Sequence, residues 1–98
     1  METKEYILCA AIWFNDGKPY VHQPKNMPKG FVICGRRHHN CLQTVDVLNA
    51  EKRLPHKHIQ GFLTNLDRFV SRKGAGKIAF EAGQIKKETD CLMSEDLY

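Results

Sequence analysis

The feature that most constrains this chain is an apolar run over residues 6–14, Tyr-Ile-Leu-Cys-Ala-Ala-Ile-Trp-Phe, in which no polar residue alternates with the apolar ones. A strand that is covered on both faces has this pattern, and a buried helix of the same length has it too. The run has nine residues, whereas a helix that crosses a membrane needs about 20. We therefore expect a buried strand here and no membrane span.

Turn residues and β-rich segments extend this interpretation. Residues 15–18 contain an Asp-Gly pair, which accepts the positive φ values of a tight hairpin, and residues 19–23 are expected to return as a second strand. Residues 31–34 follow a basic, proline-containing loop and predict a third strand, and residues 59–64 predict a fourth. The sequence therefore favours an antiparallel sheet of about four strands.

Two helices are expected beside this sheet. Asn40 is a good N-cap residue, and the spacing that follows it predicts a helix over residues 41–53, which ends before Pro55. A second helix is predicted after a short β segment at residues 69–70, with Ser71 as its cap and Gly83 just past its end. The apolar residues that recur at helical spacing are Cys41, Leu42, Val45 and Leu48 in the first helix and Ala75, Ile78, Ala79 and Ala82 in the second.

Length and composition indicate one folded α+β domain over residues 1–98. The chain is 42% hydrophobic and 27% charged, which is close to ordinary globular usage and argues against native disorder. A domain of this size has a modest core, which self-association can complete, so we expect an oligomer. The net charge of +4 favours anionic partners without choosing among them.

Four cysteines are too few for a disulfide scaffold, and the first residues do not have the pattern of a secretory leader. We therefore expect a cytoplasmic protein with reduced thiols. Residues 84–98 combine acidic groups with scattered apolar residues. They are interpreted either as a solvated tail or as a segment that docks Leu97 and Tyr98 onto a neighbouring chain.

The segment Gly35-Arg36-Arg37-His38-His39-Asn40-Cys41 joins a predicted strand to a predicted helix start. A helix N-terminus offers unpaired N–H groups and a positive dipole, and guanidinium groups bind phosphate bidentately. This junction therefore predicts a phosphate or pyrophosphate site that uses Arg36, Arg37 and His38. The alternative is that the two arginines only solvate a loop.

A second cluster of aromatic, amide and basic side chains lies between residues 62 and 72. Aromatic faces stack on bases, asparagine reads a base edge or a ribose hydroxyl, and arginine neutralises phosphate. The alternative for the two phenylalanines is a core position, which such residues occupy more often than they serve as platforms for a base. The candidate ligand-binding residues of this cluster are Phe62, Asn65, Arg68, Phe69 and Arg72.

Four potential zinc ligands lie close together in the sequence: Cys34, His38, His39 and Cys41. Their spacing matches no paired zinc knuckle, so a metal-stabilised interaction domain is the weakest candidate function. Thiol catalysis by one of these cysteines beside a histidine stays open, because only the fold shows whether the side chains meet. His56 and His58 do not make a closed metal site, and their alternative is simple exposure to solvent.

Several short stretches resemble the first family of Thoeris anti-defence proteins, small phage and prophage proteins that act as signal sponges. The resemblance covers most of the chain. The stretches that carry it are Gly-Arg-Arg-His-His-Asn-Cys at 35–41, Gln-Gly-Phe-Leu-Thr-Asn at 60–65, Arg-Phe-Val at 68–70, Ala-Phe-Glu-Ala-Gly-Gln at 79–84 and Ser-Glu-Asp-Leu-Tyr at 94–98.

The resemblance implies a protein of the host cytoplasm that captures a cyclic ADP-ribose isomer made by TIR-domain immune sensors and does not cleave it. It also implies an α/β unit that assembles as a dimer or hexamer, and some members hold cyclic di- or trinucleotides as well. Carried over by position, Arg37 takes the pyrophosphate, with Arg36 as its alternative. Phe62 stacks on adenine, and Asn65 and Arg68 meet the ribose edges.

The same residues also suit a small RNA- or DNA-binding module, which is the alternative function. The sequence contains no Walker loop, no G-x-S-x-G and no H-E-x-x-H motif. We therefore expect a binding protein with no enzymatic activity, no cofactor and no metal.

Overall fold

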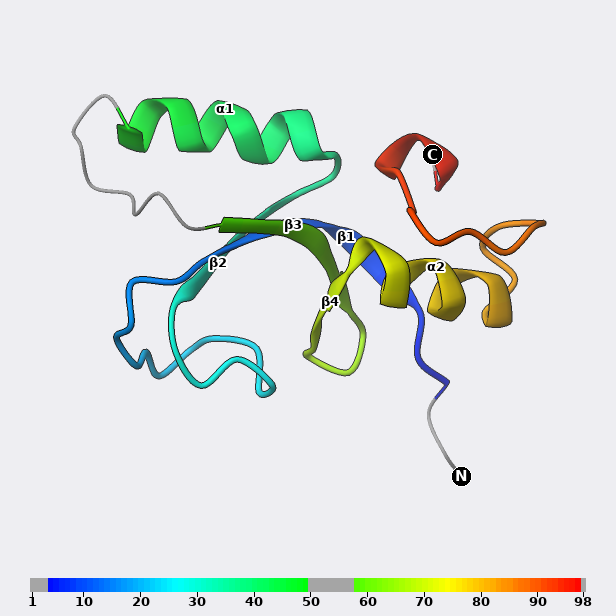
Figure 1. Cartoon of the computed structure of the whole chain (residues 1–98), viewed down its shortest axis with the longest axis horizontal. Helices are drawn as coiled ribbons and strands as arrows, with labels where there is room; N and C mark the ends of the chain where they lie inside the picture. Colours follow the sequence, from blue (N-terminus) through cyan, green and yellow to red (C-terminus); the bar gives the residue numbers. More distant parts are fainter. Residues whose placement is uncertain (1–3, 50–57, 98) are drawn as a thin grey trace.

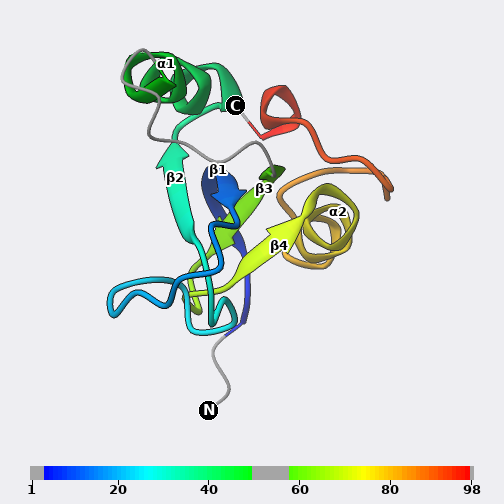
Figure 2. The same ribbon diagram turned by 60° about the vertical axis from the view of Figure 1, so that its left-hand side comes forward.

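The computed structural model describes residues 4–49 and 58–97 and confirms an α+β fold with a four-stranded antiparallel sheet and two helices (Figure 1). The helices and the C-terminal segment pack against the sheet (Figure 2). The elements in chain order are β1 (Ile7–Phe14), β2 (Phe31–Gly35), α1 (His38–Asn49), β3 (His58–Thr64), β4 (Phe69–Ser71), α2 (Arg72–Glu81) and a short 3₁₀ helix (Ser94–Asp96).

The sheet has the order β2-β1-β3-β4, so the apolar run is a strand with a partner on each edge. Phe14 lies opposite Phe31 of β2 and His58 of β3, and the alternative of a buried helix is wrong. At the other end of β1 the side-chain amide of Gln84 bonds both backbone groups of Ile7, each at 2.8 Å. This amide continues the ladder on the β2 side, where strand pairing begins only at Ala10, while Thr64 of β3 lies opposite Ile7 on the other side.

The expected return strand at residues 19–23 is wrong. Gly17 adopts a φ of +77°, as a turn there requires, but the chain then forms a loop that reaches β2. Pro19 and Pro24 have no N–H group to donate to a ladder, and both edges of β1 are already paired.

Each helix begins with a side-chain cap. α1 begins at His38 and not at residue 41. Asn40 therefore lies inside the first turn, where its Oδ1 accepts the Arg37 N–H at 3.1 Å. The predicted end of this helix at residue 53 lies outside the described residues. Ser71 caps α2 as expected, and Gly83, with a φ of +77°, follows its last residue.

One core joins the sheet, both helices and the C-terminal segment. α1 packs on β1 and β2, α2 packs mainly on β3 and β4, and the C-terminal segment lies between the two helices (Figures 1 and 2). The solvated-tail interpretation is therefore wrong for residues 92–97. The buried apolar residues that pack together in this core are Ile7, Ala10, Ile12 and Phe14 of β1, Phe62 of β3, Val70 of β4, Cys41 and Val45 of α1, Ala75 and Ala79 of α2, and Leu92, and Ala11 and Phe69 are buried as well.

Two glycines of α2 provide a matched test of how tightly the connection after this helix packs on it. A Cβ added at Gly76 would lie 2.1 Å from the Thr89 carbonyl oxygen, whereas at Gly74 the nearest atom is 3.7 Å away. We expect Gly76→Ala to destabilise the protein by about 1–3 kcal/mol through overpacking. Gly74→Ala should stabilise it by up to about 1 kcal/mol, because alanine is the better helix former. Urea unfolding of both variants measures the difference, and equal stabilities would contradict this close packing.

Candidate functional site

The predicted site residues fall into two groups. Arg36 and Arg37 precede α1, and the first residue of that helix, His38, meets Phe62 of β3 and Arg72 of α2. Asn65, Arg68 and Phe69 lie instead around the turn between β3 and β4. We call the first group, together with Gln60 and Ser94, the α1 N-terminal site.

His38 is the buried centre of this site, with 7% of its surface exposed. Its Nε2 lies 2.8 Å from the carbonyl oxygen of Gly61, which can only accept, so Nε2 carries the hydrogen. The ring stands edge-on to Phe62 at 4.9 Å between centroids. Among the described residues Nδ1 has no hydrogen-bond partner, and in the neutral ring it is an unused acceptor.

Arg72 connects three parts of the fold. Its Nη1 donates to the carbonyl of Leu92 at 2.7 Å, and its Nη2 donates to Oε1 of Gln60 at 2.7 Å. The guanidinium carbon lies 6.0 Å from the centroid of the Phe62 ring, within cation–π range. The guanidinium is thus held between β3 and the C-terminal segment, close to the start of α1.

Phe62 does not take the role that was expected of it. The residue is fully buried in the core, so its ring has no exposed face on which a base can stack. The core alternative is the observed one, and the stacking role is wrong. Instead, Phe62 supports both His38 and Arg72 from the sheet. Phe69, 7% exposed, is likewise a core residue and not a platform for a base.

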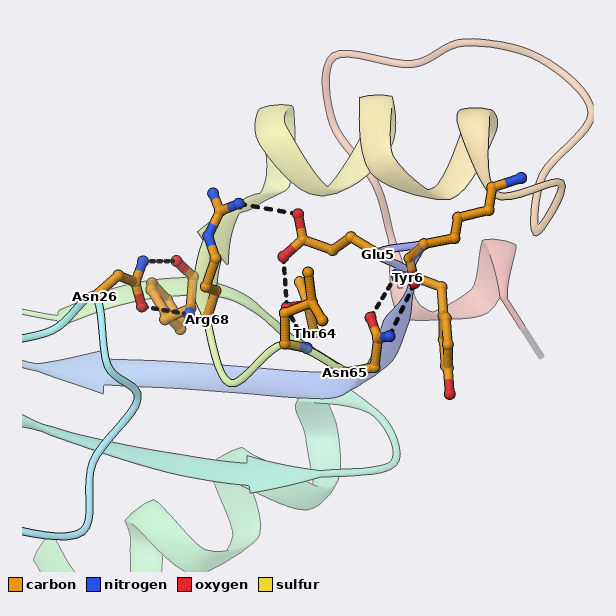
Figure 3. A network of polar contacts seen from close by, with 9 residues as sticks. Glu5, Tyr6, Asn26, Thr64, Asn65 and Arg68 are labelled. Atoms are coloured by element: carbon orange, nitrogen blue, oxygen red, sulfur yellow. Dashed lines mark hydrogen bonds and ion pairs between the residues drawn. The ribbon is translucent and has the colours of Figure 1, made fainter. Parts of the chain in front are cut away.

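Asn65 and Arg68 hold the N-terminal segment to the turn after β3 (Figure 3). The Oδ1 atom of Asn65 accepts the Tyr6 N–H at 2.7 Å, and its Nδ2 donates to the Lys4 carbonyl at 2.9 Å. The Nη1 of Arg68 lies 2.9 Å from a carboxylate oxygen of Glu5. The structure therefore shows structural contacts for both side chains and does not bring them into the α1 N-terminal site.

The described cysteines and histidines near α1 do not form a metal site. Within residues 4–49 and 58–97, no three His, Cys, Asp or Glu side chains are arranged to hold a metal ion. Cys41 is buried, with its Sγ 3.6 Å from the Ala10 carbonyl. Burial, with a contribution from Cys34, raises the pKa of the Cys41 thiol to about 11. This thiol is therefore protonated and a poor nucleophile at neutral pH.

Because His38 is buried, protonation of its ring in acid opposes folding. Burial is the main cause that lowers its pKa from the ordinary 6.5; Arg72 also lowers the pKa, while the Gly61 hydrogen bond and Glu95 raise it. The unfolded chain then binds the proton more readily, so stability is complete above pH 6.5 and falls as the pH drops below it. We expect thermal unfolding to show this loss, and His38→Gln to reduce it. His39→Gln, at an exposed position, is the control, and a His38→Gln profile like that of the parent protein would contradict the expectation.

Sequence reasoning missed the contributions of the C-terminal segment. Ser94 is only 2% exposed and its Oγ lies 3.4 Å from the backbone N of His38, although the two are 56 positions apart. No local pattern signals this contact, because the segment lacks periodicity.

Three comparisons bear on the identity of the chain. The family model described as phage T4 y16D protein matches residues 6–98. Searches of the curated proteins and of the solved structures found no match. Neither described helix is long and apolar enough to cross a membrane.

Proposed function

This chain belongs to the phage T4 y16D protein family, and from the resemblance of its sequence to the first family of Thoeris anti-defence proteins we propose that it binds a cyclic nucleotide signal of host immunity and holds it without cleavage. The ligand proposed first is a cyclic ADP-ribose isomer made by TIR-domain sensors, with cyclic di- or trinucleotides as further ligands. Such a protein acts in the host cytoplasm during infection, where it lowers the free concentration of the signal.

The observation that carries this proposal is the cationic start of α1. Arg36 and Arg37 lead directly into the helix, and the Arg72 guanidinium acts on its first residue, His38. Unpaired N–H groups and guanidinium donors are the groups that bind a phosphate or diphosphate. The site therefore suits the diphosphate that a cyclic ADP-ribose isomer carries.

The chemistry of the neighbouring residues supports binding over cleavage. The buried Cys41 thiol is protonated at neutral pH, and the Nε2 of His38 is engaged by the Gly61 carbonyl. Neither group is placed as an activated nucleophile with its base.

We expect Arg37→Ala to weaken binding of the cyclic ADP-ribose isomer by one to two orders of magnitude. The change removes a charge-assisted contact worth roughly 1.5–3 kcal/mol, and about 1.4 kcal/mol is tenfold in affinity. Isothermal titration calorimetry on Arg37→Ala and Arg36→Ala separates the two arginines. Lys18→Ala, an exposed change in the loop after β1, is the matched charge control. Full affinity in both arginine variants would remove the phosphate role of the junction.

The direct test is to incubate the protein with the products of a TIR-domain enzyme, remove free ligand, denature the complex by heat and identify what is released. Release of the intact cyclic nucleotide is the expected result. A linear product would identify an enzyme, and no release would contradict sequestration.

A small RNA- or DNA-binding module is the competing function, motivated by the net charge of +4. Salt separates the two, because affinity for nucleic acid falls steeply with salt concentration as counterions are released. A diphosphate held by the α1 N-terminal site should show a shallower dependence.

Self-association is part of the same proposal. Leu8, Val47 and Ile59 are large apolar residues that are 49%, 67% and 48% exposed on β1, α1 and β3, and contacts between copies of the chain can cover such residues. Light scattering should therefore report a dimer or hexamer, and a strict monomer at micromolar concentration would contradict it.

A further inference from the structure

The chain's own C-terminal segment occupies the start of α1. Residues 92–97 lie beside this end of the helix (Figure 1), where the Oγ of Ser94 is 3.4 Å from the backbone N of His38. The first N–H groups of a helix have no partner within the helix and are the groups that receive an anion. A serine oxygen therefore takes a position that suits a phosphate oxygen.

The same segment also engages the guanidinium of the site. The Leu92 carbonyl accepts from Arg72 Nη1 at 2.7 Å, and the Leu92 N–H donates to the Arg72 carbonyl at 3.1 Å. One short stretch of chain thus binds both donors that suit a phosphate, the α1 N–H and the Arg72 guanidinium.

Two further groups indicate which chemical groups a ligand needs if it is to replace this segment. The Glu95 carboxylate lies close enough to raise the pKa of His38, so a negative charge already stands near the start of α1. The Nδ1 of His38 is buried and has no partner within the described part of the chain, so it can accept from a hydroxyl donor. Phosphate oxygens together with a sugar hydroxyl match these groups.

The connection that leads to the segment is irregular and borders open space. Residues 84–91 contain no helix or strand, and open hollows of about 480 and 450 Å³ both border Glu88 and Thr89. Thr89 packs closely against Gly76 of α2 and anchors the chain just before the segment. The residues after Thr89 are those that contact the α1 N-terminal site.

We propose that residues 92–97 are a built-in competitor for the α1 N-terminal site. A ligand that carries phosphate and a ribose hydroxyl replaces the Ser94 hydroxyl and the Leu92 carbonyl, and its binding must offset the withdrawal of the buried Leu92 side chain from the core as the segment leaves the site. This inference rests on the proposed function, because it takes the phosphate of the captured signal to bind at the start of α1.

Amide hydrogen exchange of the full chain tests the displacement, with the cyclic ADP-ribose isomer and inorganic pyrophosphate as separate probes. In the structure the Leu92 amide donates to the Arg72 carbonyl. Saturation with a probe should break this bond and speed the exchange of the Leu92 amide by tenfold or more. The Ala82 amide, bonded to Ile78 at the end of α2, is the internal control and should not change.

Two substitutions test the competition by affinity. Ser94→Ala should raise the affinity for the probe about twofold to tenfold, since it removes one hydrogen bond from the competing segment. Glu95→Gln removes a charge beside His38 and should also raise the affinity for the probe. Glu88→Gln, at a hollow away from His38, is the control and should change this affinity less.

The outcomes separate this inference from the proposed function. Binding of the cyclic ADP-ribose isomer with unchanged or slower exchange at Leu92 would overturn the competition and leave sequestration intact. Binding of pyrophosphate alone, with faster exchange, would support the competition and count against the proposed signal. Binding of neither probe, in the parent protein and in Ser94→Ala, would overturn both.

Discussion

Phe62→Ala is expected to lower the free energy of unfolding by about 3–5 kcal/mol, as truncation of a buried phenylalanine does. The Phe62 ring is fully buried in the core and touches both the His38 ring and the Arg72 guanidinium. The substitution leaves a cavity and removes the support of both polar groups. A domain is stable by only about 5–15 kcal/mol in total, so the variant should melt well below the parent protein.

Phe80→Ala is the matched control, since Phe80 is 38% exposed on α2. Thermal and urea unfolding should show a much smaller loss for this variant. A Phe62→Ala protein that keeps its stability but loses ligand affinity would reverse our correction and restore the stacking role of this ring.

Leu92→Ala is expected to cost about 2–5 kcal/mol, the range for a buried leucine. Leu92 has no exposed surface and joins the C-terminal segment to the core of the sheet and both helices. The loss should be smaller if the segment detaches and the core closes without it, and larger if the cavity persists.

Leu42→Ala, at a position on α1 that is 41% exposed, is the control for this substitution. Urea unfolding measures both variants. Equal, small losses would mean that the segment contributes little to the core and is more loosely held than its contacts with Arg72 indicate.

Local patterns predicted most of the fold because they report on local structure. The apolar run predicted β1, and the β-rich segments predicted β2 and β3 within one or two residues. The strand at 19–23 failed because an Asp-Gly turn signal does not say which segment pairs with β1. That choice depends on β3, whose residues lie about 50 positions further along the chain.

Sequence patterns predicted only the part of the site whose residues are contiguous in the chain. The junction of residues 35–41 does lead into a helix, so the arginines and His38 were correctly placed at its start. The sequence could not assign Phe62 and Phe69 to the core or to a binding face, because an aromatic residue in a strand has the same sequence pattern in both places. The contacts of Ser94 and Leu92 depend on tertiary packing, which no periodicity in residues 84–98 reports.

The central position of β1 has a consequence for how the protein is made. Near Ile7 the side chain of Gln84 adds a further contact to β1, whose two edges are otherwise closed by β2 and β3, both of which follow it in the chain. Until those strands are synthesised, the nascent chain carries an apolar strand with open edges, which is prone to associate with other chains. Folding through such distant contacts is slow, so the edges of β1 stay open until β2 and β3 have been made.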